Sequence, residues 1–576
     1  MTHPALRIPR DALLALAVAF SLFALAACDE AADATALDAE VAAESAPTWY
    51  ADLKPVFERR CVSCHSEGGA APFRLDSLET VSAMAPAALA SIEAGRMPPW
   101  MPDPDCRPFR NERLMPAEEV ELLRRWVDGG KPEGDPANAA PDARPERRTF
   151  EPTTIARPTE AYTPTEALND DYRCFILDTE FPTDTFLTAS QVRPDAGALV
   201  HHVLVYAIAP EGLDRLYEAD AAEEGNGYTC FGGPFPNTGS GSLQDSMGSS
   251  GFPTQLGAWV PGNEPQILEE GTAIRIAAGS RIVMQVHYNL VGNETQPDAT
   301  EFAMRLTDET PQWLLNTRPI VVHELEIPAN DPAAVNRRVY RNYTNDPITL
   351  GSVSAHMHLL GNRFRSTVLR ADGTEECLFD IPAWDFNWQQ SYLFPRDELV
   401  VVQPGEALTI ECEYDNSQAN QAYVDGVQRE SVDVTWGEGT YDEMCMLYMS
   451  ILTPYTPPQT LSCAMGEQCL AECAAEGRST SDCLIGCPMP VTCKGCLLQS
   501  IIGCGGAVCL GALNEVRNDP CLETCMINSA ILNGDTSACL RDECGDKYAA
   551  VTDCLDPVLD SGRCDAQMVG CGLMGE

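Results

Sequence analysis

Two histidines separated by a single residue are the first candidates for chemistry in this chain. His356 and His358 lie in the stretch SVSAHMHLL, whose short polar–apolar alternation favours a β-strand over a helix. Alternate side chains of a strand share a face, so both imidazoles point one way and Met357 points the other. Two imidazoles on one face provide half of a metal site. An isolated pair of this kind is otherwise explained by one core and one surface histidine.

A second group of histidines lies earlier in the chain. His201 and His202 are adjacent, and His287 follows in the stretch MQVHY. Neighbouring strand residues face opposite ways, so both can bind one ion only at a strand end or bulge, or if one uses Nδ1 and the other Nε2. Three imidazoles suit copper or zinc, and we call these residues the first metal site. We interpret His323 as a structural histidine.

A methionine offers the third ligand for the His356/His358 pair. Met444 lies in the stretch YDEMCMLY, and a thioether is a soft ligand that selects Cu(I) over zinc. We call His356, His358 and Met444 the second metal site. One all-imidazole site and one site with a thioether would hold two chemically distinct copper ions.

In this order, HH, QVHY, HxHxLG and DEMCxLY resemble the copper type II, ascorbate-dependent monooxygenases, the family of peptidylglycine hydroxylating monooxygenase and dopamine β-monooxygenase. The resemblance covers residues 166–455, about half of the chain. It implies two jelly-roll-like β-sandwiches that face each other across a solvent-filled cleft, each with one copper ion. It assigns electron transfer to the first metal site and O2 activation to the second.

The same resemblance carries expectations about the reaction and the substrate. It implies hydroxylation of a C–H bond with O2, at a cost of two electrons, one held at each copper. Tyr172 and Gln285 match family positions near the first metal site, and Tyr448 matches a tyrosine on the substrate side of the second. Where peptide-amidating members have an arginine and an asparagine, this chain has Ser354 and Met446. We therefore expect a less polar or uncharged small molecule in place of a peptidyl-glycine.

A third set of chemical groups lies near the N-terminus. Cys61, Cys64 and His65 form the CxxCH motif of c-type haem attachment, in which the thiols bind the vinyl groups and the histidine ligates iron. The surrounding region resembles a small class I cytochrome c. A haem in this position would be a source of electrons for the first metal site, beside an external electron donor.

The resemblance to cytochromes c also indicates the sixth haem ligand. The stretch GRMPPW matches the ligand loop of that family, so Met97 is the expected axial thioether, which raises the haem potential. Met101 is the alternative, and Met115 is a more remote one.

Composition and the N-terminus indicate the compartment. The net charge of −47 argues against nucleic acid and anionic membrane surfaces as partners. Arg7 and Arg10 precede an apolar run over residues 12–27 that is too short to span a bilayer and ends in LAAC. We interpret it as a lipoprotein signal with lipidation at Cys28, although an ordinary signal peptide is the alternative. The expected product is an exported bacterial lipoprotein, periplasmic or at the cell surface, held to the membrane through its lipid alone.

The 25 cysteines support an oxidising compartment. The monooxygenase resemblance implies two disulfides in the copper region, Cys174–Cys230 and Cys412–Cys445. Cys106 and Cys377 are left over, and parity allows them to pair and connect the haem module to the second copper domain. In the tail, cysteines four residues apart predict helical hairpins with disulfides between them, with a zinc module as the rival interpretation. The CxxC at residues 493–496 lacks a following histidine and is no second haem motif.

The expected fold class is multidomain, with a small α-helical cytochrome c domain, two β-sandwich copper domains and a disulfide-rich α-helical C-terminal domain. The leading hypothesis is an exported copper monooxygenase acting on a small organic substrate and O2. The alternative is a non-catalytic copper and haem electron-transfer lipoprotein. The expected segments are a signal peptide (1–27), an acidic tether (28–46), the haem domain (47–133), a linker (134–162), the two copper sandwiches (163–313 and 314–457) and the cysteine-rich domain (458–576).

Overall fold

The structure is a computed structural model, and the chain divides into two compact units. One unit contains Met1–Pro98 and Met115–Pro145, and the other contains Pro99–Leu114 and Glu146–Glu576. The signal peptide and Cys28 lie outside the described residues. Within the described part, no helix combines the length and apolar character needed to cross a bilayer. The structure describes residues 46–67, 71–145, 148–165, 170–230, 233–236, 253–260, 263–290, 295–344, 346–424, 426–437, 439, 441–456, 463–487, 509–517, 519, 521–522, 525 and 536–561.

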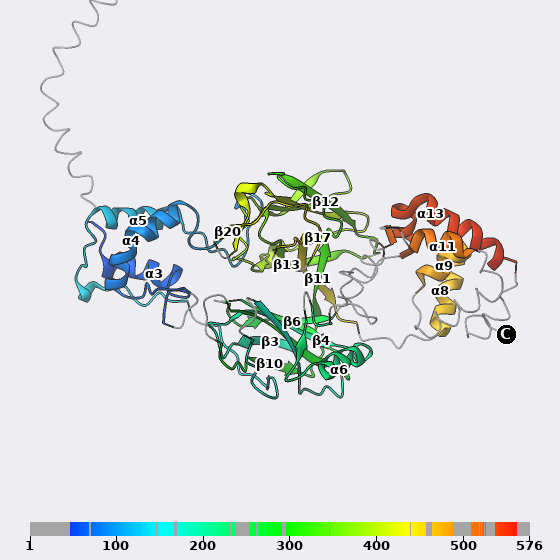
Figure 1. Cartoon of the computed structure of the whole chain (residues 1–576), viewed down its shortest axis with the longest axis horizontal. Helices are drawn as coiled ribbons and strands as arrows, with labels where there is room; N and C mark the ends of the chain where they lie inside the picture. Colours follow the sequence, from blue (N-terminus) through cyan, green and yellow to red (C-terminus); the bar gives the residue numbers. More distant parts are fainter. Residues whose placement is uncertain are drawn as a thin grey trace, which may run out of the picture. The chain divides into compact units, whose positions relative to one another are not determined.

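The first unit is a small helical module (Figure 1). Ser77 caps the longest helix in a capping box with Thr80, which satisfies backbone N–H groups that a helix start leaves unpaired. Trp126 and Leu53 are fully buried in the core between the helices. The elements are η1 (Trp49–Leu53), α3 (Lys54–Arg60), α4 (Leu78–Glu93), α5 (Ala117–Asp128) and the 3₁₀ turn η2 (Pro136–Asn138).

The segment Pro99–Leu114, which we call the strap, leaves this module and belongs to the second unit. The expected haem domain (47–133) includes these residues. The reason for the difference is hydrophobic burial: Trp100 and Phe109 are 8% and 5% exposed within the apolar core of the second β-sandwich. Cys106 is also disulfide-bonded to Cys377 of that sandwich.

The first β-sandwich encloses an apolar core between two antiparallel layers. One layer has the order β5-β2-β9-β4-β6, from β2 (Asp170–Leu177), β4 (Val200–Ile208), β5 (Tyr228–Thr229), β6 (Thr254–Trp259) and β9 (Arg281–Asn289). The other contains β1 (Thr154–Ala156), β3 (Thr185–Arg193), β7 (Gln266–Ile267), β8 (Thr272–Ile276) and β10 (Glu301–Thr307). After β4 come η3 (Pro210–Gly212) and α6 (Leu213–Ala222).

The second β-sandwich has the same two-layer construction. One layer consists of β11 (Trp313–Val321), β13 (Ile348–His356), β16 (Tyr392–Leu393), β17 (Val400–Val402) and β21 (Met446–Pro454). The other has the order β12-β18-β14-β15, from β12 (Ala334–Arg341), β14 (Gly361–Leu369), β15 (Glu375–Ile381) and β18 (Ala407–Tyr414). The short elements are η4 (Arg396–Glu398), η5 (Gln418–Asn420), β19 (Tyr423–Val424) and β20 (Val427–Gln428).

Backbone pairing joins the two sandwiches. The start of β11 pairs in parallel with β8, so that Trp313 lies opposite Thr272 and Leu314 opposite Ala273. Further along, β11 pairs with β21 over its whole length. The strand that opens the second sandwich therefore continues a sheet of the first.

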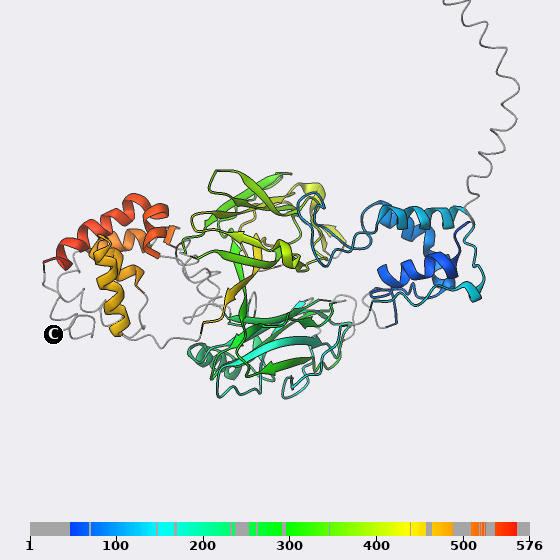
Figure 2. The same cartoon turned by 180° about the vertical axis from the view of Figure 1, so that it is seen from behind.

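The tail is a helical, disulfide-rich region, as Figure 2 shows in orange and red. Its helices are α8 (Cys463–Ala475), α9 (Thr480–Gly486), α11 (Leu510–Arg517) and α13 (Thr536–Leu559). Two disulfides join α8 to the α9 segment, which is the stapled hairpin expected from the cysteine spacing. The disulfides described in the tail are Cys469–Cys487, Cys473–Cys483, Cys509–Cys554, Cys521–Cys544 and Cys525–Cys539. The CxxC at residues 493–496 lies outside the described residues.

Candidate metal centres

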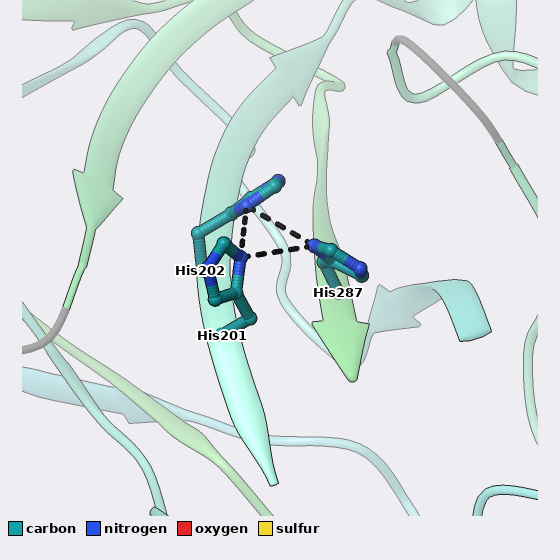
Figure 3. Close-up of side chains that lie close together, drawn as sticks. All are labelled: His201, His202 and His287. Atoms are coloured by element: carbon teal, nitrogen blue, oxygen red, sulfur yellow. Dashed lines mark hydrogen bonds between the residues drawn. The ribbon is translucent and has the colours of Figure 1, made fainter. Parts of the chain in front are cut away.

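The first metal site lies on two adjacent strands of the first sandwich (Figure 3). His201 and His202 are on β4, and His287 is on β9, directly opposite His202. The pairing of these strands shifts register between Val200 and His202, so His201 is the extra residue of a β-bulge. The bulge removes the strict alternation of a strand and allows two consecutive side chains to converge on one point.

The three imidazoles converge through their Nδ1 atoms. The Nδ1 of His287 lies 3.2 Å from Nδ1 of His201 and 3.3 Å from Nδ1 of His202, and the last two are 3.4 Å apart. An ion held tetrahedrally by imidazole nitrogens at about 2.0–2.1 Å separates those nitrogens by roughly 3.3–3.4 Å. The spacing of the side chains therefore fits one metal ion bound by three Nδ1 atoms.

The protonation state of these histidines and a hydrogen bond to one of them also favour metal binding. Burial, with further contributions from neighbouring histidines, lowers the pKa of His202 well below its usual value, and burial also lowers the pKa of His201. Neutral imidazoles are the form that ligates metals. Nε2 of His287 lies 2.8 Å from Oδ1 of Asp170, a carboxylate contact that fixes which ring nitrogen is left for an ion.

Two further residues were expected near the first metal site. The ring of Tyr172 stacks on His287, with centroids 4.0 Å apart and planes 7° from parallel. Gln285 is buried and donates through Nε2 to the carbonyl of Gly233, at 3.0 Å. Tyr172 thus contacts a histidine of the site directly. Gln285 lies two residues before His287 on β9, beside the Cys174–Cys230 disulfide.

In the second metal site, hydrogen bonds orient both histidines through Nδ1. Nδ1 of His356 contacts Oε1 of Gln389, and Nδ1 of His358 lies 3.0 Å from the carbonyl oxygen of Asp442. Because both partners are acceptors, each Nδ1 carries the proton and each Nε2 is left as the ligand atom. Burial, followed by the neighbouring His358, lowers the pKa of His356 to about 3. The two sites thus differ in ligand atom as well as in ligand type.

A buried carboxylate, that of Glu443, links the backbone of Met444 to the backbone of His358. On β13 and β21, His356 lies opposite Met446, where the paired register ends, so His358 and Met444 lie in the segments just beyond the two strands. Oε2 of Glu443 accepts hydrogen bonds from the backbone nitrogens of His358, at 2.8 Å, and of Met444, at 3.3 Å. The Cys412–Cys445 disulfide fixes the residue that follows Met444.

The sheet face that carries His356 is free of charged side chains in the neighbouring rows. Ser354 lies opposite Tyr448, and Ser352 lies opposite Ser450. Directly opposite residues share a face, and so do residues two apart along a strand. The hydroxyl of Tyr448 lies 3.9 Å from the sulfur of Met446. This face offers neutral hydrogen-bonding groups and a thioether beside the second metal site.

The CxxCH segment directly follows α3 in the first unit. Cys61 and Cys64 carry free thiols, and His65 is 8% exposed, with Nδ1 3.0 Å from the carbonyl oxygen of Phe73. That acceptor holds the proton on Nδ1 and leaves Nε2 of His65 for iron. These residues fit a covalently attached haem.

The expected axial methionines fall in different units. Met97 belongs to the first unit, as does Met115, which precedes α5. Met101 lies in the strap, where its sulfur is 3.3 Å from the backbone nitrogen of Asp385 in the second sandwich. Met101 is thus engaged in the second unit, and Met97 is the better candidate for an iron ligand.

Sequence analysis missed several residues that support the metal sites. Asp170, Gln389 and Glu443 contact the histidines, but none stands in a spacing that marks a ligand. The only signal was the acidic residue directly before Met444 in the DEMC stretch. The ring of His323 packs at a tilt of 35° against Trp436, with ring centroids 4.9 Å apart.

The first β-sandwich carries a cluster of three histidines that could hold a metal ion, and the second carries the pair His356 and His358, with ring centroids 5.1 Å apart. Residues 335–468 match the family model described as copper type II ascorbate-dependent monooxygenase, C-terminal domain. The match includes the second metal site and excludes the first. It supports this family and indicates a copper-dependent monooxygenase in general terms.

The other comparisons add no functional argument. No curated protein matches the chain. Among solved structures, the major capsid protein P2 of bacteriophage PM2 is 10% identical at a TM-score of 0.21, and covers 53% of this chain and 98% of its own. The VP2 subviral particle of infectious bursal disease virus is 11% identical at a TM-score of 0.14, with 53% and 79% covered. Likenesses this remote carry no argument about this chain.

Proposed function

We propose that this protein is an exported copper monooxygenase that hydroxylates a C–H bond of a small neutral organic molecule with O2. The observation that carries the proposal is the pair of dissimilar histidine sets, three converging Nδ1 atoms in one sandwich and, in the other, two histidines whose Nδ1 atoms are hydrogen-bonded and whose Nε2 atoms are left for a metal. When bound, two copper ions would supply one electron each for the activation of O2.

The side chains of the chain hold and orient these ions. His201, His202 and His287 would bind the first through Nδ1, with Asp170 keeping the proton on Nε2 of His287. At the second site, Gln389 and Asp442 keep the protons on Nδ1 of the two histidines, which leaves their Nε2 lone pairs for the metal. The soft sulfur of Met444 would favour the cuprous state of the ion.

The neutral sheet face beside His356 supports an uncharged substrate. A carboxylate substrate would need a cation there, because a buried charge without a partner is costly. Ser354 on β13 and Tyr448 on the neighbouring β21 lie opposite each other and offer hydroxyl groups instead. Tyr448 is the candidate for direct contact with the substrate.

The helical module is proposed to carry haem c on Cys61 and Cys64, with His65 and Met97 as axial ligands. A bound haem would supply single electrons to the copper region between turnovers, in addition to an external donor. Stopped-flow mixing of the reduced, copper-loaded protein with O2 tests this route. The route is wrong if haem oxidation does not accompany turnover.

Copper binding and O2 consumption test the main proposal. The purified protein should bind close to two copper ions, and reductant-dependent O2 uptake should follow addition of a metabolite extract. Met444→Ile should abolish hydroxylation and leave the first copper bound. Activity that survives this substitution would contradict the assignment of the second metal site. A comparison of metabolites in wild-type and knockout cells is the direct route to the substrate.

A further inference from the structure

The strap is anchored to the second β-sandwich at several points along its length. Its disulfide joins Cys106 to Cys377 on β15, with Cα atoms 5.5 Å apart. The ring of Trp100 meets Tyr392 of β16 edge-on at 5.1 Å. Such aromatic contacts contribute beyond the area that they bury. The strap thus belongs to the core of a sandwich that begins about 200 residues later in the chain.

Backbone hydrogen bonds fix the path of the strap as well. The backbone nitrogen of Asp103 donates to the carbonyl of Asp380 at 2.8 Å, and that of Arg110 donates to Leu393 at 2.7 Å. Contacts of this kind set the register of a segment, because backbone groups must be paired when they are buried. The strap consequently has one defined position on the sandwich.

At one point the strap contacts the segment Trp384–Gln390, which we call the support loop. The sulfur of Met101 lies 3.3 Å from the backbone nitrogen of Asp385. The preceding residue, Trp384, donates through Nε1 to the carbonyl oxygen of His358 at 3.2 Å. Two neighbouring residues of the support loop therefore connect Met101 of the strap to the backbone of His358, a proposed copper ligand.

The other end of the support loop reaches the second histidine. Oε1 of Gln389 contacts Nδ1 of His356, and Nε2 of the same side chain donates to the carbonyl of Phe386 at 3.0 Å. The ring of Phe386 lies edge-on to His358, with centroids 6.2 Å apart. The support loop thus contacts both histidines of the second metal site. Its Gln389 side chain also orients His356 by holding the proton on Nδ1.

We propose that the strap is a positioning element of the second metal site, and that it acts by holding the support loop against His356 and His358. This inference rests on the proposed function, because it takes those histidines as copper ligands. Residues that orient metal-ligating histidines alter metal affinity by about 10–100-fold when they are changed. The strap, which leaves the helical module that carries the haem motif, then also sets the geometry of the second metal site.

Copper affinity and spectroscopy of the full mature protein test the proposal. Each variant is titrated with Cu(I) against a competing chelator, and the Cu(II) form is examined by electron paramagnetic resonance. Cys106→Ala with Cys377→Ala removes the covalent anchor of the strap, and Met101→Ala removes the sulfur that contacts the support loop together with its packing against the sandwich core. Both variants should lower copper affinity at one of the two sites by about tenfold or more and change one of the two signals.

Arg110→Met is the matched control. The Arg110 guanidinium reaches Glu269 of the first sandwich, away from the support loop, and its backbone hydrogen bond survives the substitution. This variant should bind both copper ions as the wild type does. If the disulfide variant unfolds in a thermal melt, the Met101→Ala variant decides the outcome.

The outcomes distinguish a failure of the role proposed for the strap from a failure of the proposed function. Wild-type protein that binds two copper ions, with unchanged affinities and spectra in both strap variants, overturns the role of the strap alone. Wild-type protein that binds fewer than two copper ions overturns the proposed function and, with it, this inference. A loss that falls on the His201/His202/His287 site, identified by comparison with His201→Ala, also overturns it.

Discussion

The carboxylate of Glu443 lies 2.8 Å from the backbone nitrogen of His358, and its acceptor oxygen is shared with the backbone nitrogen of Met444. The other carboxylate oxygen accepts from the backbone nitrogen of Leu360 at 2.6 Å. Glu443 is fully buried, and burial raises its pKa to about 8 despite these three donors. One side chain thus ties two proposed copper ligands, which are 86 residues apart in the chain, to each other.

Glu443→Gln should weaken this tie. An amide keeps one oxygen but turns a donor toward a backbone N–H group, so at least one buried hydrogen bond is lost. We expect the free energy of unfolding to fall by about 1–3 kcal/mol and copper to be lost from the second site first. Chemical denaturation and copper analysis measure these effects. Asp442→Asn is the control, because the ligand contact of Asp442 is made by its backbone carbonyl, and a similar loss in that variant would contradict the assignment.

Asp170→Asn tests the outer contact of the first metal site. Its carboxylate accepts from Nε2 of His287 at 2.8 Å, and an amide can instead present a donor to that nitrogen. Affinity for the first copper should fall by about 10–100-fold, with the second copper unaffected. Asp308→Asn, on the exposed surface of the same sandwich, should change neither. Unchanged affinity in Asp170→Asn, measured by chelator competition, would show that the contact has no role.

The acid stability of the second sandwich should depend on Arg370. Burial opposes ionisation of Glu406 and Glu376, but hydrogen bonds to Arg370, among others, outweigh it and lower the pKa of both carboxyls. A lowered folded-state pKa gives stability that is present above the ordinary value of 4.5 and lost as the pH falls through the folded value. Arg370→Met should therefore lower Tm near pH 6 by more than near pH 3. Thermal melts at both values measure this, and parallel curves would contradict it.

Haem attachment should require both thiols of the first unit. Cys61→Ala with Cys64→Ala should abolish covalent haem, seen as loss of haem stain after denaturing electrophoresis, because thioethers are the bonds that survive denaturation. Copper binding in the second unit should remain. Cys106→Ala with Cys377→Ala, which removes cysteines joined in a disulfide, should keep the stain. Haem stain that persists without Cys61 and Cys64 would exclude attachment at this motif.

Local sequence predicted much of the secondary structure. The helix before CxxCH and the hairpin stapled by Cys469–Cys487 and Cys473–Cys483 follow from periodicity and spacing, which are local properties. The strand that was expected to carry both His356 and His358 ends at His356. The position of the strap was not predictable in this way. Trp100 and Phe109 are apolar wherever they lie, and only a partner surface far along the chain decided which core they enter.

The sequence by itself indicated the candidate ligand types, because its 8 histidines are few enough for their clustering to be informative and the CxxCH spacing marks a haem motif. Only the tertiary structure decided which atoms of those groups face a metal. The bulge at His201 brings three Nδ1 atoms together, and the acceptors Gln389 and Asp442 leave Nε2 of the other pair without the proton. Those acceptors come from loops remote in sequence, and hydrogen bonding to them is a property of the folded chain alone.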